Sequence, residues 1–297
     1  MMLEFHKVTL DDIERLRPLI LQGDSKICNN TVGGIFMWRD YFNMECALWD
    51  DTVILKACAN YHGVSTVFSI PLGGCPQGGL DRIAEYCREI NIPLAFYAIT
   101  VDDFDLLRTK FNDFTTETNE NWSDYIYEAS ALTKLEGRKY SGKRNHINQF
   151  KREHPGWIFE KINEENLPLV QRFYEKLSSE QEFTTHTSIE DHDKTVEVLD
   201  NYSVYGLLGG LLRVDDEIVA FSIGETKGEV LHVHIEKANT IYKGVYQVLN
   251  NEFAKLYSTE NIKCINREED DGDPGLRFSK KSYYPFMIIE KYIVVIK

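Results

Sequence analysis

Residues 206–236, GLLGGLLRVDDEIVAFSIGETKGEVLHVHIE, decide the fold of this chain. Apolar and β-branched residues dominate three successive runs, which predict strands at 206–214, 217–226 and 229–236. The runs are separated by the turn residues Asp215-Asp216 and Lys227-Gly228. Because such short connections join antiparallel strands, the stretch predicts a three-stranded meander.

The chain that follows predicts one crossover and a closing strand. Apolar residues at helical spacing indicate a helix at 244–257, and the run at 262–266 indicates a strand parallel to the third strand of the meander. A short helix at 275–281 and a final strand at 285–296 complete the pattern. This order is similar to that of GNAT-type acyltransferases. It predicts an α/β (α+β) fold in which mixed, mostly antiparallel sheets are flanked by helices.

A faint internal repeat extends this prediction to the first half of the chain. The matched segments are Phe5-His6-Lys7-Val8 with Phe159-Glu160-Lys161-Ile162, Asp50-Asp51 with Asp215-Asp216, the stretch after Gly78 with that after Lys243, and Tyr125-Ile126 with Tyr292-Ile293. Their common order favours a duplication over a coincidence of two ordinary α/β segments. We therefore predict two tandem GNAT-like domains, residues 1–133 and 134–297, with the functional site in the second.

Composition excludes several classes of protein. With 33 Lys and Arg against 47 Asp and Glu, the net charge is −14, so nucleic acid or an anionic membrane cannot be bound over the whole surface. The six cysteines show no spacing typical of a zinc site or a disulfide framework. The sequence shows neither a signal peptide nor a run of 18 apolar residues, so we expect a cytoplasmic protein with no membrane span.

The most distinctive stretch is 266–285, NREEDDGDPGLRFSKKSYYP, which follows the predicted crossover strand. A loop at the carboxyl end of such a strand is where α/β sheets place ligands. Its carboxylates offer a general base, and its guanidinium and ammonium groups offer an anion site. The competing interpretation is a solvated acidic turn in which Asp273 caps a helix.

The second distinctive stretch is basic. Residues 134–153 hold seven Lys or Arg against two Glu, a local charge of +5 on an acidic chain. On a helix from 142, Ile147 and Phe150 form the buried side, and the polar side suits tRNA, a nucleotide or a lipid headgroup. A linker helix that pairs with the acids of the chain is the alternative.

Two further features of the sequence bear on metal and CoA binding, and both argue against it. His232, His234 and Glu236 alternate along a predicted strand and so share one face, but no other segment supplies a further well-placed metal ligand. In an acetyl-CoA enzyme, a glycine-rich loop before this helix binds the pyrophosphate of CoA. The corresponding residues 241–246 contain only one glycine, Gly244. We expect neither a metal nor ordinary CoA binding.

Three separated segments resemble one family in the same order. They are Arg138–Phe150, His234–Lys237, and Asn266-Arg267-Glu268 with Asp270, Gly272, Pro274–Arg277, Lys280, Ser282-Tyr283 and Pro285. These segments resemble bacterial proteins of unknown function that are similar to the C-terminal domain of phosphatidylglycerol lysyltransferases. Through the repeat, the whole chain is similar to the tandem GNAT arrangement of Fem-type aminoacyltransferases.

The resemblance implies transfer of an aminoacyl group from aminoacyl-tRNA to a lipid headgroup or other small acceptor, without a metal, cofactor or covalent enzyme intermediate. Asp270 or Glu268 is then the base or the carboxylate that orients the acceptor. Arg277 and Lys280 hold a phosphate or the oxyanion. Glu236 orients the α-amino group of the transferred residue.

The resemblance also implies a substrate-binding set. The wall that receives the tRNA acceptor stem or headgroup comprises Lys143, Arg144, Asn145 and Asn148. The remaining members are Asn266, Arg267, Gly275 and Tyr283.

Two other functions stay open: an N-acyltransferase that uses acyl-CoA, and a non-catalytic binding module that kept the fold. The lipid acceptor leaves a peripheral membrane location open beside the cytoplasmic one.

Overall fold

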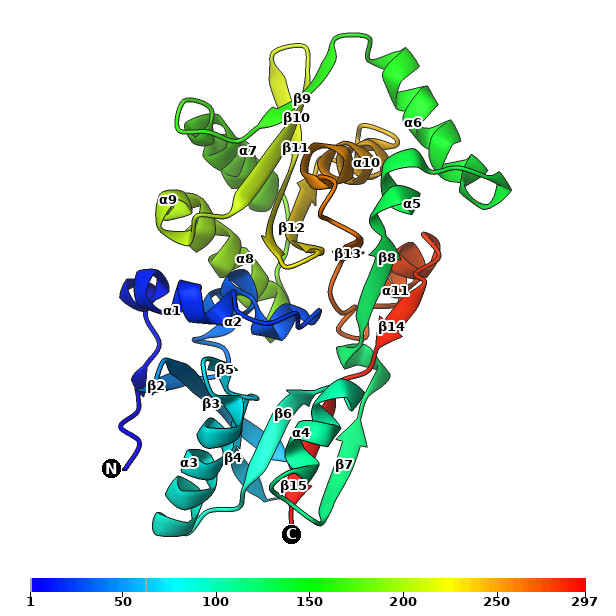
Figure 1. Ribbon diagram of the computed structural model, residues 1–297. Helices are drawn as coiled ribbons and strands as arrows, with labels where there is room; N and C mark the ends of the chain where they lie inside the picture. The colour runs from blue at the N-terminus through cyan, green and yellow to red at the C-terminus, as the bar shows by residue number, and fades with distance from the viewer. Residues whose placement is uncertain (1, 62) are drawn as a thin grey trace. The chain divides into compact units, whose positions relative to one another are not determined.

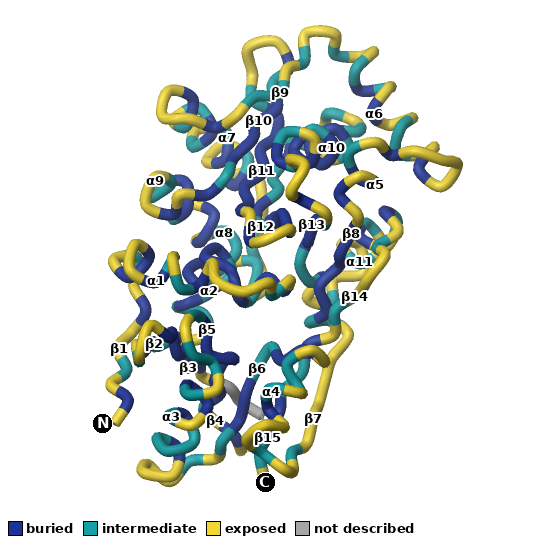
Figure 2. The backbone as a smooth tube through the Cα atoms, in the orientation of Figure 1, coloured by how far each residue is buried: buried dark blue, intermediate teal, exposed yellow. Residues whose placement is uncertain are grey.

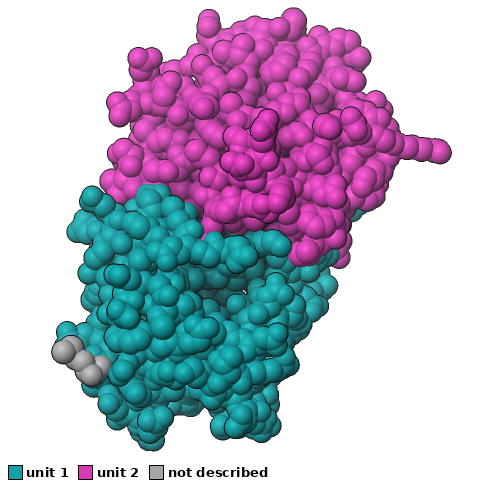
Figure 3. Space-filling model, in the orientation of Figure 1, with its two compact units in different colours: residues 1–125, 269–278, 288–297 teal, residues 126–268, 279–287 magenta. Residues whose placement is uncertain are grey.

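The computed structural model describes residues 2–61 and 63–297 and divides into two compact units. Unit 1 comprises Met1–Tyr125, Glu269–Phe278 and Ile288–Lys297, and unit 2 comprises Ile126–Glu268 and Ser279–Met287 (Figure 3). Each unit contains one mixed sheet flanked by helices, so the predicted fold class is confirmed.

Unit 1 is built on the sheet β1-β2-β3-β4-β6-β15-β7, with β5 paired to β3. Its strands are β1 (His6–Lys7), β2 (Glu45–Trp49), β3 (Thr52–Tyr61), β4 (Val64–Phe68), β5 (Leu72–Gly73), β6 (Ala95–Ile99), β7 (Phe114–Thr118) and β15 (Tyr292–Ile296). Its helices are α1 (Ile13–Ile20), α2 (Val32–Trp38), α3 (Pro76–Glu89) and α4 (Phe104–Arg108), with 3-10 turns at Leu10–Asp12, Cys28–Asn30, Val101–Asp103 and Glu120–Trp122.

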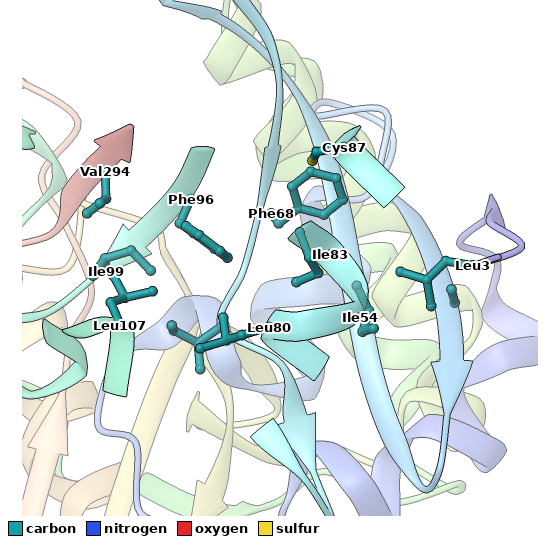
Figure 4. Packing of buried hydrophobic residues seen from close by; sticks show 12 residues of the cluster. Leu3, Ile54, Phe68, Leu80, Ile83, Cys87, Phe96, Ile99, Leu107 and Val294 are labelled. Carbon is teal, nitrogen blue, oxygen red and sulfur yellow. The ribbon is translucent and has the colours of Figure 1, made fainter. Parts of the chain in front are cut away.

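The core of unit 1 lies between its sheet and α3. Leu80, Ile83 and Cys87 recur at spacings of three and four residues, which places them on one side of α3. They pack with Phe68 of β4 and Phe96 of β6, all fully or almost fully buried (Figure 4). Burial of this apolar area is the main stabilising contribution to the unit.

Unit 2 is built on the sheet β14-β8-β13-β12-β11-β10-β9. Its strands are β8 (Asp124–Glu128), β9 (Trp157–Lys161), β10 (Leu208–Val214), β11 (Glu217–Lys227), β12 (Val230–Ala238), β13 (Cys264–Asn266) and β14 (Met287–Ile289). Its helices are α5 (Ala129–Lys134), α6 (Ser141–Glu153), α7 (Leu167–Ser179), α8 (His186–Asp200), α9 (Tyr202–Tyr205) and α10 (Val245–Tyr257), with a 3-10 turn at Arg138–Tyr140. Helix α11 (Pro274–Lys281) contributes residues to both units.

The predicted meander and crossover are confirmed in unit 2. Strand β11 pairs antiparallel with β10 and with β12, whereas β12 and β13 are parallel and joined through α10. Strands β11 and β12 are buried along most of their length (Figure 2). The strong sequence signal of these strands reflects this burial.

The two closing strands are exchanged between the sheets. Strand β8 follows the elements of the first half but pairs with β13 in unit 2. Strand β15, at the end of the chain, lies between β6 and β7 in unit 1 (Figure 1). These are the strands that carry the matched dipeptides Tyr125-Ile126 and Tyr292-Ile293.

The exchange alters two sequence-based expectations. The single strand predicted at 285–296 is wrong, because β14 and β15 are separate strands that belong to different sheets. The compact units also differ from a division between residues 133 and 134, since they are interleaved along the chain.

Candidate functional site

A β-bulge in β12 determines which side chains meet in unit 2. Ile223 of β11 pairs with Ile235, but the next residue, Gly224, pairs with Val233, so His234 is an extra residue. The bulge breaks the alternation along the strand. The rings of His232 and His234 stack 6.4 Å apart, whereas Glu236 lines a cavity together with Val233. The expectation that both histidines and Glu236 share one face is therefore wrong.

The cavity beside Glu236 is small and mostly apolar. It measures about 10 Å³, close to the space of one water molecule, and three of its lining residues are polar. Glu236 accepts hydrogen bonds from Arg267 Nη2 at 2.7 Å and from Asn250 Nδ2 at 2.5 Å. The remaining lining is Leu132, Leu231, Val233, Phe253, Ala254 and Ile265.

Arg267 is a polar group of this cavity with unused hydrogen-bond donors. Its residue is 7% exposed, and its Nε and Nη1 atoms have no hydrogen-bond partner among the described residues. Asn250 Oδ1 is likewise buried and has no hydrogen-bond partner among the described residues. Buried donors without partners are costly, so this cavity is suited to a group that accepts hydrogen bonds from Arg267.

Tyr283 connects Arg267 with Lys143. The centroid of its ring lies 5.1 Å from Arg267 Cζ and 3.9 Å from Lys143 Nζ, so both cations contact one buried ring. Lys143 also donates a 2.6 Å hydrogen bond to Ser282 Oγ. Burial, assisted by the charge of Arg267, lowers the pKa of Lys143 to about 8.

His234 lies between two carboxylates. Its Nδ1 is 2.6 Å from Glu268 Oε1 and its Nε2 is 2.9 Å from Glu225 Oε1, with 1% of its side chain exposed. Burial alone lowers the pKa of His234, but the two carboxylates outweigh it and raise the pKa to about 10. Lys280 Nζ donates to the backbone oxygen of Glu268 at 3.2 Å. Glu268 and Lys280, predicted as base and oxyanion group, thus have defined structural partners.

In unit 1, Asp270 and Arg277 form a closed network. Arg277 Nε donates to Asp270 Oδ2 and Nη2 to Oδ1, both at 2.8 Å, and Tyr125 Oη donates to Oδ2 at 2.6 Å. Burial alone raises the pKa of Asp270, but these hydrogen bonds lower it to about 2. Such a carboxylate is a poor proton acceptor at neutral pH. Arg277 is further bound to Glu120 at 2.6 Å. These contacts support the path of the loop, and the roles of Asp270 as base and of Arg277 as anion holder stay predictions.

The other predicted residues divide into structural and exposed groups. Asn266 Oδ1 accepts from Glu268 N at 2.6 Å, which forms a turn in the loop. Arg144 donates to the backbone oxygens of Leu135 and Gly137, so it closes the turn before α6. The exposed group comprises Asn145, Asn148 and Gly275. The predicted burial of Ile147 and Phe150 on the helix at 142–153 is confirmed.

Sequence reasoning did not identify every residue of this site. Asn250 could have been found, because it is a polar residue amid the apolar positions of a helix that must pack on the sheet. Ser282 gave no signal beyond its place in the family-like segment.

A buried lysine in unit 1 was also missed. Lys291 Nζ lies 2.8 Å from Asp124 Oδ1, 2.9 Å from Glu269 Oε2 and 3.6 Å from Cys28 Sγ. Burial lowers the pKa of Lys291, but its acidic neighbours, Asp124 first, raise it well above the ordinary value. The ligand atoms of Cys28, Asp124 and Glu269 are close enough to hold a metal ion, but the ammonium group already supplies positive charge there.

A second group of candidate metal ligands, His6, Asp12 and Cys46, has a similar limitation. Arg15 donates to Asp12 Oδ1 at 2.8 Å and so places a positive charge at that group.

Within the described part of the chain, no helix has both the length and the apolar character needed to cross a membrane.

Comparison with known proteins identifies the family. Residues 22–295 match the model of the family "Phosphatidylglycerol lysyltransferase, C-terminal", and the chain belongs to this family. The match extends over nearly the whole chain, whereas the segments that carried the resemblance lie within residues 138–285.

Solved structures agree with the fold. A conserved protein of unknown function from Bacteroides thetaiotaomicron is 29% identical, with all of both chains covered and a TM-score of 0.88. L-PGS from Bacillus licheniformis is 16% identical over 96% of this chain and 92% of that one, with a TM-score of 0.69. FemX is 10% identical over 98% and 96%, with a TM-score of 0.55.

Proposed function

We propose that this protein transfers an aminoacyl group from aminoacyl-tRNA to a lipid headgroup or another small acceptor. Membership of the lysyltransferase family supports this class of reaction. The observation that carries the proposal is the cavity of unit 2, where buried Arg267 has unused donors beside the carboxylate of Glu236.

The groups of this cavity match the two ends of an aminoacyl ester. Its carbonyl oxygen gains negative charge as a nucleophile attacks, and a pair of fixed donors stabilises that charge. Arg267 Nε and Nη1 are such donors. The α-ammonium group of the ester suits the carboxylate of Glu236, whose orientation is fixed by Arg267 and Asn250. A cavity of one water's size accepts the carbonyl oxygen, while the rest of the aminoacyl group lies outside it.

The acyl-CoA alternative has less support. Gly244 has φ 85°, and a Cβ atom there would lie 2.6 Å from the backbone oxygen of His146. Close packing against α6 and a left-handed conformation therefore account for this glycine without a pyrophosphate.

The test is thermal stabilisation of the full chain by a nonhydrolysable aminoacyl-adenosine analogue, by acetyl-CoA and by charged tRNA at low and moderate salt. A saturating ligand that binds only the folded state raises the melting temperature by several degrees. We expect a shift with the analogue that Glu236→Gln abolishes. The matched control is Glu229→Gln, which alters an exposed ion pair with Lys263 in the same unit. A shift with acetyl-CoA alone favours the acyl-CoA function, and no shift with any ligand favours a binding module.

A further inference from the structure

Two side chains of unit 1 converge on the ring nitrogen of a third. His6 Nε2 lies 2.9 Å from Asp12 Oδ1 and 3.3 Å from Cys46 Sγ. The three atoms all lie within 4.8 Å of one another. In a tetrahedral zinc site, bonds of about 2.0 to 2.3 Å place neighbouring ligand atoms about 3.3 to 3.6 Å apart. Small side-chain movements therefore suffice to bring all three atoms onto one ion.

The backbone fixes the positions of these three side chains. His6 of β1 and Cys46 of β2 are partners in the antiparallel register, so their side chains project from the same face of the sheet. Asp12 belongs to a capping box in which Thr9 N and Thr9 Oγ1 donate to Oδ2 at 2.9 and 3.2 Å. Oδ2 is thereby engaged, and Oδ1 is the oxygen directed at His6. Because the three residues come from separate elements, no short spacing in the sequence marks them.

The group combines two buried side chains with one exposed entrance. The side chain of Asp12 is 9% exposed and Cys46 is fully buried, whereas 48% of the His6 side chain is exposed. An ion can therefore enter from solvent beside His6 and keep a water molecule as a fourth ligand. Imidazole, carboxylate and thiolate are the donors that Zn²⁺ takes in proteins. With a neutral imidazole their charges sum to −2, which matches the charge of the ion.

Arg15 competes with a bound cation but does not close the site. Its Nη2 atom donates to Asp12 Oδ1 at 2.8 Å and lies 3.3 Å from His6 Nε2. The Arg15 side chain is 52% exposed, so it can rotate into solvent at little cost, because an ion pair this exposed contributes little to stability. Lys291, which occupies the other candidate group, has only 4% of its side chain exposed and has no such freedom. The limitation set by a nearby cation is therefore weaker at His6.

We propose that His6, Asp12 and Cys46 bind one Zn²⁺ ion, with water as the fourth ligand. Arg15 rotates away when the ion binds, and the Cys46 thiol releases its proton to solvent, because Zn²⁺ binds the thiolate. Strand β1 lies at the edge of the unit 1 sheet and pairs with β2 over only two residues. The ion joins this strand and the turn at Asp12 to β2, so it stabilises the edge of the sheet. The inference is independent of the proposed transfer, whose residues lie in unit 2.

The test is titration of the metal-free full chain with Co²⁺, which occupies zinc sites and absorbs visible light. One equivalent should give thiolate-to-cobalt charge-transfer absorption and the visible bands of tetrahedral Co²⁺, and one equivalent of Zn²⁺ should remove both. Cys46→Ser should abolish the charge-transfer absorption. His6→Gln, at an exposed position, should weaken binding about 100-fold or more, because even residues that only support a ligand contribute about 10- to 100-fold. Arg15→Gln should tighten binding about tenfold, because it removes a competing positive charge.

Matched controls separate this site from other thiols and imidazoles. Cys58→Ser and His146→Gln alter an exposed cysteine and an exposed histidine, and both should bind Co²⁺ as the parent does. Cys28→Ser alters the other candidate group and should also leave the spectrum unchanged. Zn²⁺ should raise the melting temperature of the parent and of Arg15→Gln, but not that of His6→Gln, because an ion that binds only the folded state stabilises it.

Three outcomes would overturn the proposal: no charge-transfer absorption at one equivalent of Co²⁺, a spectrum that Cys28→Ser removes, or binding that His6→Gln leaves unchanged. Stabilisation by the aminoacyl-adenosine analogue without any metal binding would leave the proposed function standing and refute the zinc site. Metal binding that depends on His6 and Cys46, without any response to that analogue, would support the zinc site and refute the donor.

Discussion

The buried imidazolium of His234 makes a quantitative prediction about stability. Its pKa is raised to about 10 in the folded protein, against about 6.5 for an unperturbed histidine. Above pH 6.5 the folded state therefore binds more protons at this position than the unfolded state does. The stabilisation is fully present below pH 6.5 and is lost as the pH rises through 10.

The magnitude follows from the two pKa values. One proton of difference changes the free energy of unfolding by about 1.4 kcal/mol per pH unit. Between pH 7 and pH 9, partial protonation at each end reduces the expected loss to about 2 to 3 kcal/mol. Lys143 acts in the opposite direction above pH 8, because its pKa is lowered in the folded state. The contribution of His234 must therefore be measured as the difference in free energy of unfolding between the parent protein and the His234→Gln variant.

The assay is urea unfolding of the parent and of His234→Gln from pH 7 to pH 9, followed by far-UV circular dichroism. The stability advantage of the parent should shrink by the stated amount over this range. His146→Gln, which alters an exposed histidine of α6, should show no such trend. A change below about 0.5 kcal/mol would mean that His234 is neutral in the folded protein. NMR of the imidazole nitrogens would then show a neutral ring at pH 7.

Two further predictions concern unit 1. Lys291→Met should lower the free energy of unfolding in urea by about 3 to 5 kcal/mol, because it leaves buried Asp124 without its cation. The control Lys297→Met, at an exposed pair with Asp113, should change it by less than about 1 kcal/mol. Equal effects would refute the assigned role of Lys291. Arg277→Ala should lower the melting temperature and increase proteolysis of residues 269–278. Arg277→Lys should restore the melting temperature only in part, because one ammonium group cannot replace three guanidinium donors. A parent-like melting temperature in Arg277→Ala would exclude a supporting role.

The meander and crossover could be predicted from sequence because their determinants are local. Strands β10 to β12 are apolar runs joined by short turns, and each determines its neighbour through a hairpin. The exchange of β8 and β15 could not be predicted in this way. Both strands carry similar residues in the repeat, and the sequence does not specify which sheet each one joins. Pairing between distant segments depends on tertiary packing.

The bulge at His234 shows how one residue changes a predicted site. Regular alternation places His232, His234 and Glu236 together, which is a metal-like pattern. One extra residue rotates Glu236 to the cavity and leaves His234 between carboxylates. The sequence of the strand has no glycine or proline that marks such a bulge.

The charged loop after β13 illustrates why charge in a sequence does not locate a catalytic group. Its first three acids are each bound to a cation from another element: Glu268 to His234, Glu269 to Lys291 and Asp270 to Arg277. Burial alone raises the pKa of Asp270, but the hydrogen bonds from Arg277 lower it to about 2, so this carboxylate serves poorly as a base. These pairs fix the path of the loop. Glu236, also paired with a cation, differs from them because it lines a cavity that is also lined by Arg267, whose Nε and Nη1 donors are unused, so the proposed transfer is to be tested there.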